Sequence, residues 1–199
     1  MTATVSGTVD ITDNTGIESV VDTFEVEGDF TLTATQADGE TITGSGAVTV
    51  TDLESGTDLS YVSTDLTVTA TVTGAIDITG NPTDGGIQTI VDSFDIQSGR
   101  LTLSAAQADG ESITGSGTVE VVGIGDDSDL SNIDTTDLYV IADVNSTTDI
   151  RNNPTAVAGD PDVGITQVVD EFALDDATLI LSLAQADGEL MSGSGLVTV

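Results

Sequence analysis

The amino-acid sequence predicts an all-β protein built from three tandem repeats, and two observations carry this prediction. The pentapeptide Gln-Ala-Asp-Gly-Glu occurs three times, at residues 36–40, 107–111 and 185–189. Each copy is followed by Gly-Ser-Gly, at residues 44–46, 115–117 and 193–195. Apolar and polar residues alternate around these motifs with period two, which is typical of strands with one buried face.

Three strands are expected in each repeat. In the first repeat they cover residues 4–11, 30–36 and 42–50. Asp38-Gly39 between the last two predicts a hairpin turn, since Gly accepts the positive φ that such turns require. The glycines Gly44 and Gly46 interrupt the last strand, which indicates a bulge or the close approach of another backbone.

Residues 17–24 leave two alternatives open. Ile17, Val20, Val21 and Phe24 have the spacing of a helix face, but the stretch is rich in β-branched residues, which favour extended chain. We expect a strand or extended turn leading into Phe24, with a two-turn helix as the alternative.

The repeats are assigned to residues 1–51 (repeat 1), 65–122 (repeat 2) and 137–199 (repeat 3), joined by linkers at 52–64 and 123–136. Each repeat is predicted to be a small antiparallel sandwich or meander. Two arrangements stay open, with the repeats either in a row or closed into a pseudo-threefold.

Two residue types recur among the apolar positions of every repeat. Phe24, Phe94 and Phe172 are the expected core anchors, because Phe buries the largest apolar area in a chain with only 3% aromatic residues. Asp22, Asp92 and Asp170 are expected to accept backbone N–H hydrogen bonds at a turn.

The charge balance is extreme. Lys and Arg together number 2 against 35 Asp and Glu, giving a formal net charge of −33. Such a chain repels itself in dilute buffer, whereas molar salt screens the repulsion. We therefore expect adaptation to high salt. Without a basic patch, binding to nucleic acids and to anionic membranes is excluded.

Most catalytic arrangements are excluded as well. The sequence contains no His and no Cys, and its two basic residues are both Arg. Ser-His, Cys-His and Schiff-base chemistry are therefore impossible. Pairs of carboxylates remain, but with 35 acidic residues they arise by chance, so we expect a protein that is not an enzyme and has no organic cofactor.

Calcium or another salt cation is the one cofactor that the sequence suggests, because Asp-rich loops supply the oxygen ligands such ions prefer. The candidate ligands are Asp126, Asp127, Asp129, Asp160 and Asp162. A solvated acidic loop is the alternative explanation for both clusters.

In composition and repeat architecture the chain resembles the surface or decoration proteins of haloarchaeal tailed viruses. The resemblance implies a structural part of a virion that binds other virion proteins or copies of itself within a symmetric assembly. The first residues lack a basic region followed by an apolar stretch, so we expect synthesis in the host cytoplasm without a signal peptide and no membrane insertion. The alternatives are an extracellular cell-surface or filament adhesion module of a halophile and a calcium-stabilised binding module.

Overall fold

The computed structural model describes residues 1–81, 86–125, 127–153 and 164–199. Repeat 1 contains β1 (Thr2–Val5), β2 (Thr8–Asp10), β3 (Thr23–Val26), β4 (Asp29–Thr33), α1 (Ala34–Ala37), β5 (Thr41–Gly44) and β6 (Ala47–Thr51). Repeat 2 contains β7 (Thr67–Val72), β8 (Ala75–Asp77), α2 (Ile87–Ile90), β9 (Ser93–Ile96), β10 (Arg100–Ser104), α3 (Ala105–Ala108), β11 (Ser112–Gly115) and β12 (Thr118–Val122). Repeat 3 contains β13 (Tyr139–Val144), β14 (Thr148–Asp149), α4 (Ile165–Val168), β15 (Glu171–Leu174), β16 (Thr178–Ile180), β17 (Leu190–Gly193) and β18 (Leu196–Thr198).

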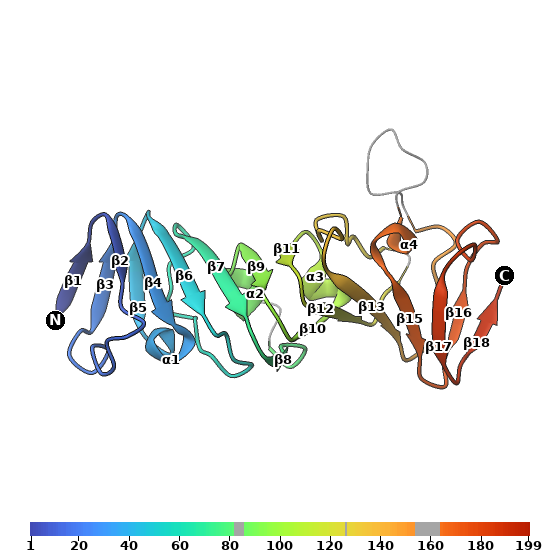
Figure 1. The fold of residues 1–199 in the computed structure, drawn as a ribbon, viewed down its shortest axis with the longest axis horizontal. Coiled ribbons are helices and arrows are strands. Elements are labelled where there is room, and N and C mark those ends of the chain that lie inside the picture. The colour runs from blue at the N-terminus through green and yellow to red at the C-terminus, as the bar shows by residue number, and fades with distance from the viewer. Residues whose placement is uncertain (82–85, 126, 154–163) are drawn as a thin grey trace.

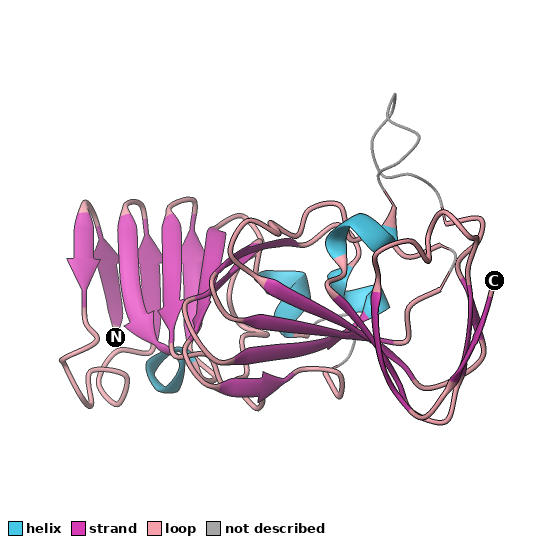
Figure 2. Cartoon of the chain, turned by 45° about the vertical axis from the view of Figure 1, so that its right-hand side comes forward, coloured by secondary structure: helices cyan, strands magenta, loops and turns pink. Residues whose placement is uncertain are grey.

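The pairings among these strands are all parallel. The chain winds as successive coils of two strands each, and the strands of the N-terminal part stand side by side across the long axis (Figure 2). The molecule is therefore a parallel β-solenoid. The all-β prediction is confirmed, and the predicted antiparallel sandwich or meander is wrong.

The error has a physical origin. Alternation shows that one face of a strand is buried, but it is the same in parallel and antiparallel sheets. Asp38-Gly39 does not close a hairpin, because β4 and β5 lie in different sheets. Instead the chain makes the helical turn α1, passes Gly39 at a φ of 71° and starts the next coil. Neighbouring parallel strands cannot be joined by a hairpin and require a longer crossover connection, which here is one coil of the solenoid.

The Gly-Ser-Gly motif is the corner of a coil. The strand expected over residues 42–50 is broken there into β5 and β6, which belong to different sheets. A Cβ on Gly46 would lie 2.2 Å from the carbonyl oxygen of Gly28 on the preceding coil. The predicted close approach of another backbone is confirmed.

Residues 17–24 and their equivalents match neither prediction in full. They contain at most one helical turn instead of two, and they are not extended over their whole length. Repeats 2 and 3 have one helical turn each, α2 and α4. In repeat 1, residues 17–20 form hydrogen-bonded turns, with the N–H groups of Val20 and Val21 donating to the carbonyl of Ile17. A strand follows in every case.

The sheets are shared between repeats. Their strand orders are β1-β3-β5, β11-β9-β7-β6-β4-β2, β17-β15-β13-β12-β10-β8 and β14-β16-β18. Each six-stranded sheet thus joins the second strands of one repeat to the first strands of the next. Two three-stranded half-sheets remain, one at each end of the molecule.

Each coil of the solenoid has three sides. Because the sheets are shared, each repeat is rotated about the solenoid axis by one side relative to the repeat before it. The sides are the first strand, the second strand and the connecting segment. In repeat 2 the first strands continue the second-strand side of repeat 1. The second strands of repeat 2 adjoin the linker that follows repeat 1 and forms the connecting side of its last coil, since the N–H of Asp77 donates to Ser55 Oγ at 2.9 Å.

The repeats stand in a row, with the two termini at opposite ends of an elongated molecule and no closed pseudo-threefold ring (Figure 1). One continuous apolar core runs inside the coils. Phe24, Phe94 and Phe172 are at most 2% exposed, which confirms them as core anchors.

The two linkers also contribute to the core. Leu59 and Val62 are buried in the first, and Leu130 and Ile133 in the second. Val62 forms a parallel bridge with Ile42 of β5, and Ile133 forms the same bridge with Ile113 of β11. Each linker thus covers the last coil of the repeat before it.

Candidate functional site

The three glutamines of the repeated pentapeptide tie neighbouring coils together. Gln107 is 1% exposed, and its Nε2 donates to the carbonyl oxygens of Ile78 (2.6 Å) and Asn81 (3.3 Å) one coil away. Its Oε1 accepts the N–H of Ser104 at 2.8 Å, and the Ser104 hydroxyl accepts the N–H of Gln107, which forms a capping box on α3. Gln36 makes the corresponding bonds to Ile11, Asn14 and Thr33.

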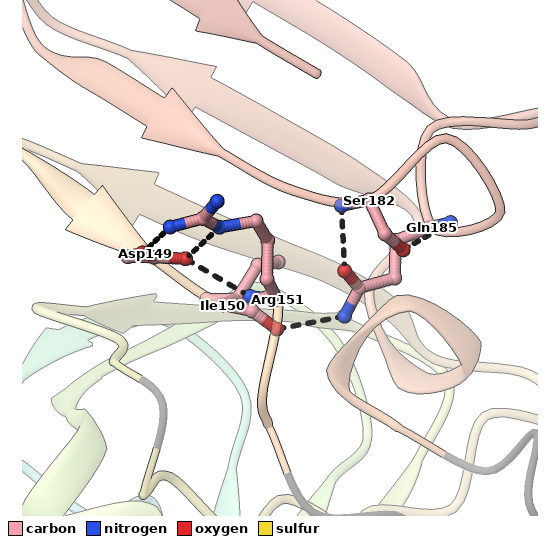
Figure 3. Close-up of polar contacts among 5 residues, drawn as sticks. All are labelled: Asp149, Ile150, Arg151, Ser182 and Gln185. Carbon is pink, nitrogen blue, oxygen red and sulfur yellow. Dashed lines mark hydrogen bonds and ion pairs between the residues drawn. The ribbon is translucent and has the colours of Figure 1, made fainter.

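Figure 3 shows the same arrangement in repeat 3. Gln185 Nε2 donates to the carbonyl of Ile150 at 2.7 Å, and its Oε1 accepts the N–H of Ser182 at 2.9 Å. Here the glutamine is half-buried, because no following coil covers it in the described structure. The role of these glutamines was not predicted, although their threefold recurrence is the signal that could have identified them.

A second repeated feature is a pair of carboxylates on adjacent coils. The register places Asp92 beside Glu111 and Asp170 beside Glu189, because Ser93 pairs with Ser112 and Glu171 with Leu190. Burial, together with the neighbouring Asp92 carboxylate, raises the pKa of Glu111 to about 7. Burial and Asp170 likewise raise the pKa of Glu189 to about 7.

The aspartates of these pairs hold the first strand of their repeat. Asp92 Oδ2 accepts the N–H of Val68 at 2.7 Å, and Asp170 Oδ2 accepts the N–H of Val140 at 2.7 Å. Asp22 forms an ion pair with the amino group of Met1 at the equivalent place. The predicted acceptance of backbone N–H groups is confirmed for Asp92 and Asp170, but the donors lie on a neighbouring coil and not in a local turn.

Beside the Gln185 contact lies a cavity of about 440 Å³, lined in part by Arg151, Gln167, Asp187 and Glu189. The Arg151 guanidinium donates to both carboxylate oxygens of Asp149, at 2.9 and 2.6 Å (Figure 3). Hydrogen bonds from the Arg151 side chain and backbone lower the pKa of Asp149 to about 2. Glu189 is the group in this cavity that can exchange a proton near neutral pH.

Of the five predicted calcium ligands, Asp127 and Asp129 lie within the described structure. Asp127 and Asp129 are exposed on one loop, and Asp129 Oδ1 accepts the N–H of Ser131 at 3.0 Å. Hydrogen bonds from the side chain and backbone of Ser131 lower the pKa of Asp129. Asp126, Asp160 and Asp162 lie outside the described residues. Within the described ranges, no group of three or more His, Cys, Asp or Glu side chains could hold a metal ion.

The last coil of the described solenoid carries several exposed apolar side chains, and its surface is here called the tail face. It consists of β17, β18 and residues 182–189. Its exposed members are Leu183 (78%), Leu190 (52%), Leu196 (62%) and Val199 (63%). In the described part of the chain, β17 and β18 are the last strands of their sheets. This surface was also not predicted.

Comparison with protein-family models, with curated proteins and with solved structures finds no match for this chain. No described helix is both long and apolar enough to cross a membrane. The fold defines the class of protein, a parallel β-solenoid.

Proposed function

We propose that this chain is a non-enzymatic structural rod that is built into a larger assembly in high salt. The observation that carries the proposal is the apolar tail face on a chain of net charge −33. Large apolar side chains exposed on neighbouring elements of one coil favour an interaction surface over a solvated one. The shared sheets make the three repeats a single elongated body suited to such a role.

The assembly that we propose is a virus particle of a salt-loving archaeon, in which the chain forms part of the surface. The support is the acidic, lysine-free composition together with an elongated repeat fold. Mass spectrometry of purified particles from a salt-grown host tests this directly. Detection of the chain at a stoichiometry comparable to that of other coat components is expected, and its absence from every particle contradicts the proposal.

A second candidate is a filament or adhesion module on the surface of a halophile. The observation that favours it is the open edges of β17 and β18, because an exposed edge strand can pair with a strand of another protein. Fractionation of a salt-grown host separates the two candidates, since this one places the chain in the cell envelope in uninfected cells.

The absence of catalysis is part of the proposal. The carboxylate pairs of Glu111 and Glu189 recur at equivalent positions in consecutive repeats, as a structural feature does. A glycosidase also needs two carboxylates, one of them with a raised pKa. A screen of hydrolase substrates in molar KCl with the wild type and Glu189→Gln is expected to detect no turnover. Activity lost in that variant would contradict a purely structural role.

A further inference from the structure

The tail face differs from the equivalent surfaces inside the molecule in both residue type and exposure. Leu183 corresponds to Ala34 and Ala105, which are 2% and 8% exposed. Leu190 corresponds to Thr41 and Ser112, and Leu196 to Ala47 and Thr118. Large apolar side chains therefore replace small or polar ones at three positions of the last coil. A solvated end would favour the opposite change.

The internal junctions show how such a coil is covered. Strand β7 adds to β6 with Val50 opposite Ala70, and β13 adds to β12 with Val121 opposite Ala142. Val50 and Val121 are fully buried as a result, whereas their counterpart Val199 is 63% exposed. In the described structure no strand pairs with β18 in the way that β7 pairs with β6 and β13 with β12.

The opposite end, here called the head face, carries the matching element. Strand β1 corresponds to β7 and β13, and it is the first strand of a three-stranded half-sheet. Val20 lies two residues before Asp22, whose N–H donates to the carbonyl of Met1 at the start of β1. Val20 is 61% exposed, whereas its counterparts Ile90 and Val168 are 8% and 7% exposed. Head and tail are thus the two halves of a junction that the molecule already contains twice.

The rotation of the repeats places the half-sheet at the head and the half-sheet at the tail on the same side of the solenoid. Each repeat turns by one side of a three-sided coil, so three repeats complete one full circuit. The half-sheet β14-β16-β18 at the tail therefore lies on the side that β1-β3-β5 occupies at the head. Joining them would give a third six-stranded sheet of the internal kind.

We propose that the tail face binds the head face of a second copy of this chain, so that copies stack head to tail. Strand β1 of the second copy adds in parallel to β18, with Val199 opposite Ala3 and Thr198 opposite Thr2. Leu183 and Leu190 pack against the region of Val20, in place of the apolar linker side chains that cover the internal junctions. The inference rests on the proposed structural role and names its partner.

Salt controls this contact. Acidic residues contact the elements at both ends. Asp22 pairs with Met1 and Glu25 lies opposite Thr4 of β1, while Glu171 and Asp176 accept hydrogen bonds from Ser192 and Ser194 of the last coil. Their repulsion opposes stacking in dilute buffer and is screened at molar salt, where the Debye length is about 3 Å. Stacking is therefore expected to increase with KCl concentration.

The test uses single cysteines, which the natural sequence lacks. Neighbouring strands lie about 4.8 Å apart, within the Cα separation that a disulfide bridges. A mixture of Thr2→Cys and Thr198→Cys proteins under mild oxidation in about 2 M KCl is expected to give mainly the mixed disulfide dimer. Thr49→Cys, on the side of the rod, replaces Thr198→Cys in the matched control and is expected to give no enrichment.

A second variant tests the apolar contact. Leu190→Ser with Leu196→Thr restores the residues found at the equivalent positions of repeat 2. It is expected to lower the yield of the mixed dimer about tenfold or more without lowering the thermal midpoint of the monomer.

Three results would overturn the inference. The first is a predominance of Thr198→Cys homodimers, which would indicate tail-to-tail pairing. The second is a yield of mixed dimer no higher than in the Thr49→Cys control. The third is a yield of mixed dimer that the leucine substitutions do not change. Because the experiment uses purified protein, these results are independent of whether the chain is found in virus particles. Failure of the head-to-tail contact and failure of the virion role are therefore distinguishable.

Discussion

At the scale of single residues, buried polar side chains hold the coils in register. A buried Gln is unusual because its amide must find several partners. Gln36 and Gln107 achieve this by bonding to the backbone of two coils at once. They connect the start of each helical turn to the corner of the preceding coil, where apolar contacts alone do not specify the alignment.

Gln107→Ala is expected to lower the free energy of unfolding by about 1–3 kcal/mol, because the substitution removes the buried bond to the Ile78 carbonyl and leaves the part-buried Ser104 N–H without its acceptor. Denaturant unfolding in molar KCl measures this. Gln185→Ala is the matched control, with a smaller loss expected because water can reach this half-buried site. Equal losses for the two variants would contradict a role that depends on burial.

The carboxylate pairs make stability depend on pH. The folded-state pKa of Glu111, about 7, is above its ordinary value of 4.5. The folded state therefore binds the proton more tightly than the unfolded state. This favours folding fully below pH 4.5, and the benefit is lost as the pH rises from 4.5 through 7.

Glu111→Gln is expected to be more stable than the wild type above pH 7, with the difference disappearing at acid pH. Thermal melts across this range at constant molar KCl provide the measurement. Glu54→Gln removes one charge from an exposed loop and serves as the control. The same pH-dependent gain in that control would show that net charge, and not the pair with Asp92, is responsible.

At the scale of elements, coil corners depend on glycines that stack on one another. Gly28 lies against Gly7, and Gly46 lies against Gly28, so the backbones of three consecutive coils touch at one edge. At these positions any Cβ would overlap a backbone atom of the preceding coil.

Gly46→Ala is therefore expected to destabilise the protein by about 1–3 kcal/mol through overpacking. Gly56→Ala is the control, since a Cβ there has no neighbour within 4 Å, and its effect should stay within about 0.5 kcal/mol. Chemical denaturation of both variants makes the comparison. A Gly46→Ala protein as stable as the control would contradict the close approach.

Sequence reasoning found the β-rich repeats and their core, because burial of Phe24 and its equivalents depends on alternation within a single strand. It did not find the direction of pairing, which depends on where the chain goes after Asp38-Gly39. Both a hairpin and a crossover begin with a turn of this type. Nor did it identify Glu111, whose pKa is raised by burial and by the carboxylate of Asp92, a neighbour 19 residues away in sequence.

The tail face could have been inferred from the sequence. Leu183, Leu190 and Leu196 stand where the other repeats have Ala, Thr or Ser, and aligning the repeats position by position reveals the change. Its meaning required the solenoid, since only the winding of the coils shows that these residues lie on the last described coil and the segment leading into it.

At the scale of the whole molecule, charge sets the conditions under which the rod is stable. Raising KCl from about 0.1 M to about 2 M is expected to raise the thermal midpoint by about 10 °C or more, because the repulsion among carboxylates is screened. Scanning calorimetry tests this. Sucrose is the control, since it favours compact states without screening charge. An equal rise in sucrose would assign the effect to solvent exclusion.

Because each repeat is rotated by one side of the coil, a stack of copies would have a surface that repeats at regular intervals and has a direction. The nine coils of the described structure, spaced about 4.8 Å apart, make each copy contribute roughly 43 Å of length. Because three repeats complete a full circuit, a loop such as the one bearing Asp127 and Asp129 would recur at that spacing along one line of the fibre. The two ends of the fibre would remain chemically different, so growth and capping could be controlled separately at each.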